Sequence, residues 1–435
     1  MTAHLAGPLG FIVVLLLIAV RVPIAVAMAL VGIVGAIALG GWEQASYILS
    51  NLPYEAASGD GMEVVPLFIF MGVFASFSGL SANLYNGVQA MIGHRRGGIA
   101  MATVGASAIF GAICGSSLAT AATIGRVAMP EMRARGYADS LSAASVAAGG
   151  TLGVLIPPSI ILILYAIMTR NSIGALFAGA LVPGLVATAL YMTAIFIQVT
   201  RRPELAPAAP RLSFTERAAA LLRIWDAALL ILLVIGGIYG KIFSPTEAAA
   251  VGAGGSLVIT VARGRLTVAV LKAGIAETAA MTGMIFLILI GASIFNYFIE
   301  LSGLTDLLTS GIAATGLPPL GVLILVIVFY IVLGCFMDSL SMILLTVVPM
   351  YKLVTGLGYD PVWFGVLIVC VAEIGLITPP IGMNLFVLQG TTPGLKLDTI
   401  VRGILPFILA DVVRIAVLVA LPGVVLFLPS LLGLR

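Results

Sequence analysis

The sequence predicts an all-α protein that crosses a membrane many times and forms an inverted repeat with two re-entrant helical hairpins and two broken helices. The first observation is composition: of 435 residues, 61% are hydrophobic and 9% are charged, and the mean hydropathy is +1.20. The second is an internal sequence repeat, and the third is a Pro-Pro pair inside apolar sequence in each copy. A chain this apolar is expected in lipid rather than in water.

Apolar stretches long enough to span a bilayer recur along the chain, for example at Val22–Leu39, Ala279–Ile299 and Leu320–Met337. Because a spanning helix needs roughly 20 apolar residues, we expect about ten to fourteen membrane segments. The first apolar run, Leu9–Val20, has neither a basic region before it nor a small-residue cleavage site after it. We interpret it as a retained segment and not as a signal peptide.

Charge and cysteine content exclude several function classes. The net charge is only +3, and no basic run is long enough to suggest a nucleic-acid surface. Cys114, Cys335 and Cys370 all lie in apolar sequence and the chain has two histidines, so neither a disulfide framework nor a metal cluster is supported. An intramembrane enzyme is disfavoured, because there is no His-Glu-x-x-His and too few histidines for a His-based triad.

The repeat is clearest at Gly153–Pro158 and Gly375–Pro380, which share the pattern Gly-x-x-x-Pro-Pro at a spacing of 222 residues (375 − 153). Glycine and proline are frequent here, with 50 and 22 copies, so a single match could be coincidence. Agreement at several separated positions favours duplication. The same spacing of 222 relates three further pairs: Pro23 with Pro245, Gly32 with Gly254, and Ser116 with Asp338.

A long polar stretch, Thr200–Arg223, divides the chain nearly in half. We therefore predict a first half at residues 1–199, a basic cytoplasmic linker at 200–223, and a second half at 224–435. Each half is expected to contain scaffold helices, one hairpin and one broken helix.

Loop charges indicate that the two halves are inverted. The predicted loop Gly40–Glu63 contains acidic residues, Asp60 among them, but no Lys or Arg, whereas its counterpart in the second half carries Arg263, Arg265 and Lys272. Under the positive-inside rule these segments lie on opposite sides of the membrane. By the same rule, His94–Arg96 is cytoplasmic and its uncharged counterpart, residues 316–318, is outside.

Each Pro-Pro pair predicts a helix break at membrane depth. Consecutive prolines remove N–H donors and push the preceding residue out of the α region, which frees carbonyls near Gly153–Ile156 and Gly375–Thr378. Non-helical backbone at this depth is tolerated only where it lines a cavity or binds an ion. Freed carbonyls suit a hard cation such as Na⁺.

About forty residues before each break lies a cluster of small or polar residues, Cys114–Ser117 and Gly334–Ser339. Each cluster predicts a re-entrant hairpin facing the broken helix. The hydroxyls of Ser116, Ser117 and Thr378 would add neutral oxygen ligands. The alternative is that such residues only allow close helix packing in the membrane.

Two carboxylates, Asp338 and Glu373, lie in the most apolar part of the second half. An ionised carboxylate at that depth costs roughly 2.5–3.5 kcal/mol on insertion scales, which favours a function. For Asp338 we prefer an ion-site or gating role over a structural hydrogen bond, and for Glu373 both stay open. Glu247 is better explained as part of a capping box that begins at Ser244.

Several blocks in order resemble one family: Gly115–Ser117, Met129–Met132, Ala148–Ser159, Pro245–Ala250, Met337–Asp338 and Glu373–Asn384. This family is the large, DctM-type membrane subunit of tripartite ATP-independent periplasmic (TRAP) transporters, and the resemblance spans nearly the whole chain. It implies an elevator-type carrier, in which a scaffold stays still while a transport domain with both hairpins moves. It also implies uptake of a small organic carboxylate driven by a Na⁺ gradient.

The resemblance also implies site residues. The family usually has serine where Cys114 stands, and a thiol is a poor Na⁺ ligand, so a backbone carbonyl is the better candidate there. We expect the substrate between the hairpins, in contact with Ser116, Ser117, Thr151, Asp338 and Asn384. One Na⁺ site is expected at Cys114, Ser117, Gly153, Ile156 and Pro158, and a second at Gly334, Gly375, Thr378 and Ile381.

The family further implies a small four-helix membrane subunit and a soluble periplasmic binding protein as partners, in the bacterial inner membrane, with Na⁺ as coupling ion and no cofactor. C4-dicarboxylates, sugar acids and sialic acid are all compatible as substrates. The acidic stretch Glu43–Glu63 could dock the binding protein or could be a solvated loop. The main alternative is a divalent-anion/Na⁺ symporter that needs no binding protein; the duplicated breaks argue against a passive channel.

Overall fold

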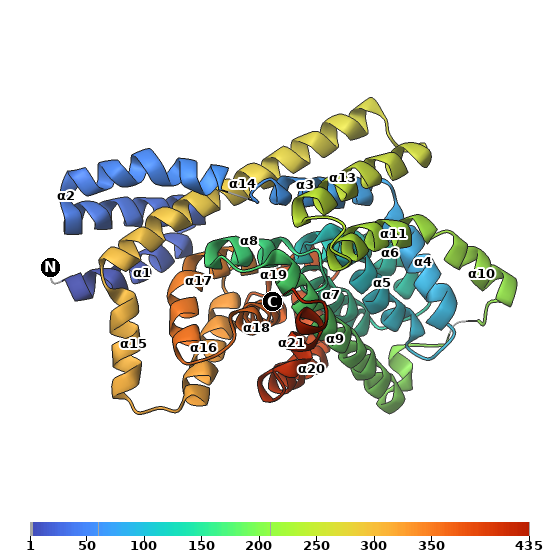
Figure 1. The fold of residues 1–435 in the computed structure, drawn as a ribbon. Coiled ribbons are helices and arrows are strands. Elements are labelled where there is room, and N and C mark those ends of the chain that lie inside the picture. Colours follow the sequence, from blue (N-terminus) through green and yellow to red (C-terminus); the bar gives the residue numbers. More distant parts are fainter. Residues whose placement is uncertain (1–2, 60, 209, 435) are drawn as a thin grey trace.

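The computed structural model describes residues 3–59, 61–208 and 210–434. Within this part every regular element is helical, which confirms the predicted all-α class (Figure 1). The first half contains α1 (Ala3–Ala19), α2 (Ile24–Ser58), α3 (Val64–Phe77), α4 (Leu80–Ile92), α5 (Gly98–Cys114), α6 (Ser117–Ala134), α7 (Asp139–Leu155), α8 (Ile160–Thr169) and α9 (Ile173–Arg201).

The predicted linker is partly ordered, with the 3₁₀ turn η1 (Pro203–Leu205) and the short helix α10 (Phe214–Leu222). The second half contains α11 (Trp225–Ile231), the π-helical segment η2 (Leu232–Gly236), α12 (Gly237–Tyr239), α13 (Pro245–Ala262), α14 (Val268–Leu301), α15 (Leu304–Ala314), α16 (Pro319–Gly334), α17 (Ser339–Gly356), α18 (Pro361–Ile377), α19 (Met383–Thr391), α20 (Leu397–Ala420) and α21 (Gly423–Leu431).

Six of the described helices are long and apolar enough to cross a membrane, or up to eight if each strongly bent pair counts as one span. The expected ten to fourteen segments are reached only if four shorter apolar helices, α1, α5, α16 and α18, are counted as well. The individual helices of the hairpins and of the broken helices are shorter than a full membrane span. A count based on helix length therefore gives fewer segments than expected.

Helix boundaries keep the spacing found in the sequence. α6 begins at 117 and α17 at 339, α7 begins at 139 and α18 at 361, and these two end at 155 and 377, each time 222 residues apart (339 − 117, 361 − 139, 377 − 155). The predicted hairpins, α5–α6 and α16–α17, and the broken helices, α7–α8 and α18–α19, are therefore present in matching positions. The division into two halves at the linker stays a prediction.

The stretch 40–63 was expected to be a loop, and this expectation is wrong. α2 continues to Ser58 through a kink at Gly41, whose φ is +75°. Because glycine adopts a positive φ without strain, the chain turns there and resumes helix instead of ending it. Glu43 and Glu55 lie on the second arm of α2, and Asp60 lies outside the described residues.

α2 and α14 are long helices that run side by side, and α14 also packs against the hairpin helix α17 (Figure 1). They approach closely through glycines, because a Cβ added at Gly32 would lie 2.9 Å from the carbonyl oxygen of Ile294, and one at Gly291 would collide with Ala25 O. Small residues permit this approach between membrane helices. We call α2 and α14 the scaffold pair.

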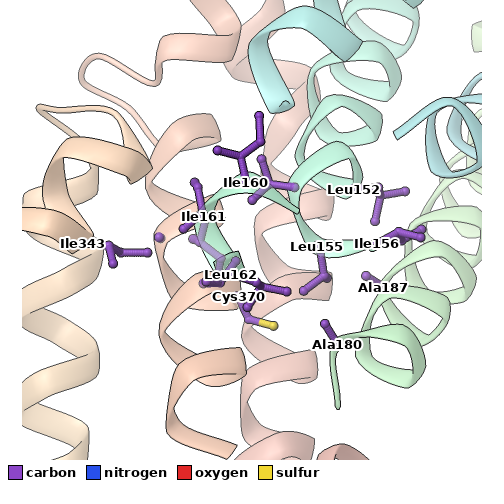
Figure 2. Packing of buried hydrophobic residues seen from close by; sticks show 14 of the residues in the cluster. Leu152, Leu155, Ile156, Ile160, Ile161, Leu162, Ala180, Ala187, Ile343 and Cys370 are labelled. Atoms are coloured by element: carbon purple, nitrogen blue, oxygen red, sulfur yellow. The ribbon is translucent and has the colours of Figure 1, made fainter. Parts of the chain in front are cut away.

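Apolar packing fixes the first helix break. Figure 2 shows Leu155 and Ile156 at the end of α7 beside Ala187 of α9, with Ile160 at the start of α8. A Cβ added at Gly184 of α9 would lie 2.7 Å from Ile156 Cγ1. Ile156 therefore packs against α9 at a position where that helix has no side chain. The break is therefore held in a buried apolar setting and is not exposed to lipid.

Candidate substrate and cation site

The first hairpin turns at Gly115, whose φ is +65°. Ser116 then takes an extended conformation and caps α6, with its Oγ accepting a hydrogen bond from Ala119 N at 3.4 Å. The second hairpin has the same arrangement, because Asp338 caps α17 and accepts from Ser341 N at 3.0 Å and Ser341 Oγ at 2.7 Å. Ser116 and Asp338, paired by sequence spacing, therefore occupy equivalent capping positions. The structural hydrogen-bond role of Asp338 is present, and its ion-site or gating role stays a prediction.

The two breaks separate α7 from α8 and α18 from α19, and each contains its Pro-Pro pair with a cis peptide bond. Ser159 caps α8 by accepting from Leu162 N at 3.3 Å. In the second break, the hydroxyl of Thr378 donates to Ile374 O at 2.7 Å, which leaves the lone pairs of its oxygen for another partner.

The structure brings the first hairpin tip against the first break. A Cβ added at Gly153 would lie 2.9 Å from Ser116 O, and one added at Gly115 would lie 3.0 Å from Pro158 O. Backbone carbonyls of the tip and of the break thus lie within one small region, together with Cys114 and Ser117. This region is the predicted first Na⁺ site.

The second tip meets the second break in the same way. A Cβ added at Gly375 would lie 2.8 Å from Gly334 O and 2.5 Å from Gly334 Cα. Glycine at position 375 allows this backbone contact, because a Cβ there would collide with the backbone of Gly334. Thr378 and Ile381 follow in the break itself, so the four residues of the predicted second Na⁺ site belong to one tip and one break.

Thr120 is a residue that the sequence reasoning missed. It is fully buried, and its hydroxyl has no hydrogen-bond partner among the described residues. A Cβ at Gly153 would collide with that hydroxyl, which places it at the first predicted Na⁺ site. The available signal was its position three residues after Ser117, on the same face of α6.

A cavity of about 590 Å³ lies between the hairpins and the scaffold pair. Its wall includes the predicted substrate residues Ser116, Ser117 and Asp338. The remaining wall residues come from the tips, the breaks and the scaffold pair: Gly115, Leu118, Ala119, Ser339–Ser341, Val154, Ile160, Ile161, Glu373, Leu376, Met383, Pro23–Ala25, Met281, Met284, Ile285, Leu287 and Ile288.

Glu373 is part of this wall and is fully buried. Its Oε1 accepts a hydrogen bond from Ser339 Oγ at 3.1 Å, and its Oε2 has no partner among the described residues. One carboxylate oxygen is therefore anchored to the second hairpin, and the other is enclosed by protein atoms.

Asn384 and Thr151, the other predicted substrate residues, are not part of the cavity wall. Asn384 Nδ2 donates to Ser117 Oγ at 2.9 Å and to Ala147 O at 3.1 Å. Thr151 Oγ1 donates to Ala148 O at 2.7 Å and lies 3.1 Å from the hydroxyl of Tyr191. Both residues therefore lie outside the cavity, and their hydrogen bonds go to other protein groups.

Behind Thr151 lies a buried network that the sequence reasoning also missed. Tyr191 donates to Asp411 Oδ2 at 2.7 Å, Asp411 pairs with Arg414 at 2.9 Å, and Arg414 donates to Cys370 O at 3.2 Å. The side chains of Arg414 and Asp411 are 1% and 0% exposed. It joins α7, α9, α18 and α20, and the available signal was two charges three residues apart inside an apolar helix.

The donor set fits a monovalent hard cation better than a transition metal. Among residues 3–59, 61–208 and 210–434 no group of three or more His, Cys, Asp or Glu could hold a metal ion. The residues that meet at the tips and breaks instead offer carbonyl and hydroxyl oxygens, including the unpartnered Thr120 oxygen. Oxygen atoms are the ligands that hard cations prefer.

Comparison with known proteins gives a consistent answer. The model of the family described as "Tripartite ATP-independent periplasmic transporter, DctM component" matches residues 11–424. The C4-dicarboxylate TRAP transporter large permease protein DctM of Pseudomonas aeruginosa is 35% identical, over 88% of this chain and 89% of that protein. The ectoine large permease protein TeaC of Halomonas elongata is 34% identical, over 84% and 86%.

The isethionate TRAP transporter permease protein DctMQ of Oleidesulfovibrio alaskensis is 32% identical over 95% of this chain and 64% of that protein. Among solved structures, the YdaH transporter of Alcanivorax borkumensis superposes with a TM-score of 0.62 over 92% of this chain and 97% of that one, at 15% identity. At that identity the likeness concerns the fold alone.

Proposed function

The chain belongs to the family of DctM components of tripartite ATP-independent periplasmic transporters, and from this premise we propose that it imports a small organic carboxylate with Na⁺ as coupling ion. The family consists of transporter permease subunits, not of enzymes. The observation that carries the proposal is the cavity of about 590 Å³ between the two hairpin tips and the scaffold pair.

The position of this cavity supports an elevator mechanism. One wall consists of tips and breaks, which belong to tightly packed hairpin and broken helices, and the other consists of α2 and α14. A substrate held against the first wall would travel if the hairpin group slid along the scaffold pair. Binding sites of secondary transporters lie at such repeat interfaces near the bilayer midplane.

The wall is suited to a carboxylate. The N-termini of α6 and α17 both reach the cavity, at Ser117 and Ser339. Unpaired amides and the positive end of the helix dipole favour an anionic group at this position. Ser116 and Ser117 would donate hydrogen bonds, while bound Na⁺ would offset the charges of Asp338 and Glu373. Asn384 and Thr151 would act indirectly by fixing the wall.

The two predicted Na⁺ sites would connect ion binding to closure of the hairpins. At the first, Ser116 O and the Thr120 hydroxyl lie beside Gly153 and Pro158 O lies beside Gly115, and at the second, Gly334 O lies against Gly375. A cation at each position would draw tip and break together, so the substrate wall would be complete only with Na⁺ bound.

The names of the relatives support a small polar substrate and the presence of partner proteins. Their names give C4-dicarboxylate, isethionate and ectoine as cargo, all small polar solutes. We propose a carboxylate of the C4-dicarboxylate, sugar-acid or sialic-acid type. We also propose that a small membrane subunit and a periplasmic binding protein complete the transporter in the inner membrane, as the family description and the name DctMQ suggest.

Reconstitution tests this function. The chain and its small subunit are placed in liposomes, and uptake of labelled carboxylates is measured with and without an inward Na⁺ gradient and candidate receptors. Uptake that needs both Na⁺ and receptor supports the proposal. Na⁺-driven uptake without any receptor would instead favour a binding-protein-independent divalent-anion symporter.

A further inference from the structure

A second cavity lies far from the hairpin tips, where the α4–α5 loop meets the C-terminal part of α9. Its volume is about 630 Å³. It is lined by Arg95 and Arg96, which we call its cationic side, and by apolar residues such as Ile92, Met192 and Phe196, which we call its apolar side. A cavity with one cationic and one apolar side is suited to an amphiphilic ligand.

The cationic side is not neutralised by the protein. Neither Arg95 nor Arg96 makes an ion pair with any residue that the structure describes. Partial burial and the nearby charges of Arg217, Arg211 and Arg95 lower the pKa of His94. Nε and Nη2 of Arg217 and Nδ1 of His94 are enclosed without a hydrogen-bond partner among the described residues.

The apolar side includes a residue that is exposed on a candidate membrane span. Phe196 is 59% exposed although it belongs to α9, which is one of the candidate membrane spans. α10 packs against α4 and presents Phe214, 86% exposed, and Leu222, 71% exposed, beside Arg217. Exposed apolar side chains on a short helix beside a basic residue are suited to the membrane surface. The positive-inside rule places this surface on the cytoplasmic side.

We propose that this cavity binds the headgroup of an anionic phospholipid. The phosphate would lie between Arg95 and Arg96 as a charge-assisted, bidentate contact, and an acyl chain would follow Met192 and Phe196 into the bilayer. Basic pockets between membrane helices on the cytoplasmic side recognise lipids through this combination. An inorganic phosphate would use the arginines but would gain nothing from the apolar side.

The test uses the purified full chain in detergent. Native mass spectrometry measures the affinity for phosphatidylglycerol and for phosphatidylcholine with the same acyl chains. Because both arginines favour an anionic headgroup, we expect phosphatidylglycerol to bind roughly tenfold or more tightly. The double variant Arg95→Gln/Arg96→Gln should lose this preference, and Phe196→Ala should weaken both lipids equally.

The control is Arg201→Gln/Arg202→Gln, which removes the same charge from the nearby end of α9 without touching the cavity wall. It should keep the preference for phosphatidylglycerol. Three results would overturn the proposal: an equal loss in both double variants, displacement of the lipid by inorganic phosphate, or displacement by the small membrane subunit. The last result would assign the cavity to a protein interface.

Discussion

Asn384 of α19 donates a hydrogen bond to Ser117 of α6 at 2.9 Å, although the two residues lie 267 positions apart in the chain. The bond ties the broken helix of the second half to the hairpin tip of the first. Asn384 is fully buried, and it also donates to Ala147 O. Any ligand that contacts Ser117 is therefore sensitive to the position of Asn384.

We expect Asn384→Ala to destabilise the protein by about 1–3 kcal/mol, because Ala147 O and Ser117 Oγ lose their donor in a buried site. Thermal unfolding in detergent measures the stability, and Na⁺-dependent uptake measures the effect on Ser117. Asn296→Leu is the matched control, since the amide of Asn296 is buried with no partner among the described residues. If Asn384→Ala unfolds no earlier than this control, the bond has no structural role.

Thr120→Val should raise the Na⁺ concentration needed for half-maximal uptake by roughly tenfold, the effect of removing one oxygen from a charged partner. Thr120→Ser should restore the wild-type value, because it keeps the oxygen. Uptake rates are measured over a range of Na⁺ concentrations. A wild-type Na⁺ requirement in the valine variant together with an altered one in the serine variant would mean that the methyl packing matters and the hydroxyl does not.

Gly375→Ala should abolish transport, because the new Cβ would lie 2.5 Å from the backbone of Gly334 and would push the second tip away from its break. Overpacking of this kind typically costs about 1–3 kcal/mol. Gly390→Ala is the control on the neighbouring helix α19, where a Cβ meets nothing within 4 Å. Transport by Gly375→Ala at the rate of Gly390→Ala would refute the close contact.

Asp411→Ala should destabilise the fold by roughly 3–5 kcal/mol, because it leaves the buried Arg414 guanidinium without its counter-charge. Tyr191→Phe should cost less, about 1–2 kcal/mol, because only one hydrogen bond is lost. Asp398→Ala removes an exposed partner of Arg402, with side chains 68% and 77% exposed, and should change stability by less than about 0.5 kcal/mol. Similar unfolding temperatures for Asp411→Ala and Asp398→Ala would contradict the network.

Local sequence signals predicted the backbone of the site well. Pro157-Pro158 and Pro379-Pro380 fall at the breaks, and Ser116 and Asp338 cap equivalent helices, because proline and capping chemistry act within a few residues. The same local reasoning failed at residues 40–63. An acidic composition suggested a loop there, but a single glycine turns α2 without ending it.

The sequence by itself determined the helical class, the membrane environment, the repeat of 222 residues and the positions of tips and breaks, since composition and proline act locally. The tertiary structure decided which tip meets which break, that Thr151 and Asn384 lie behind the cavity wall, and that Thr120 has an unpartnered hydroxyl. It also decided that Tyr191 meets Asp411, 220 residues away. Contacts across such separations depend on how whole helices pack, and no local pattern encodes that packing.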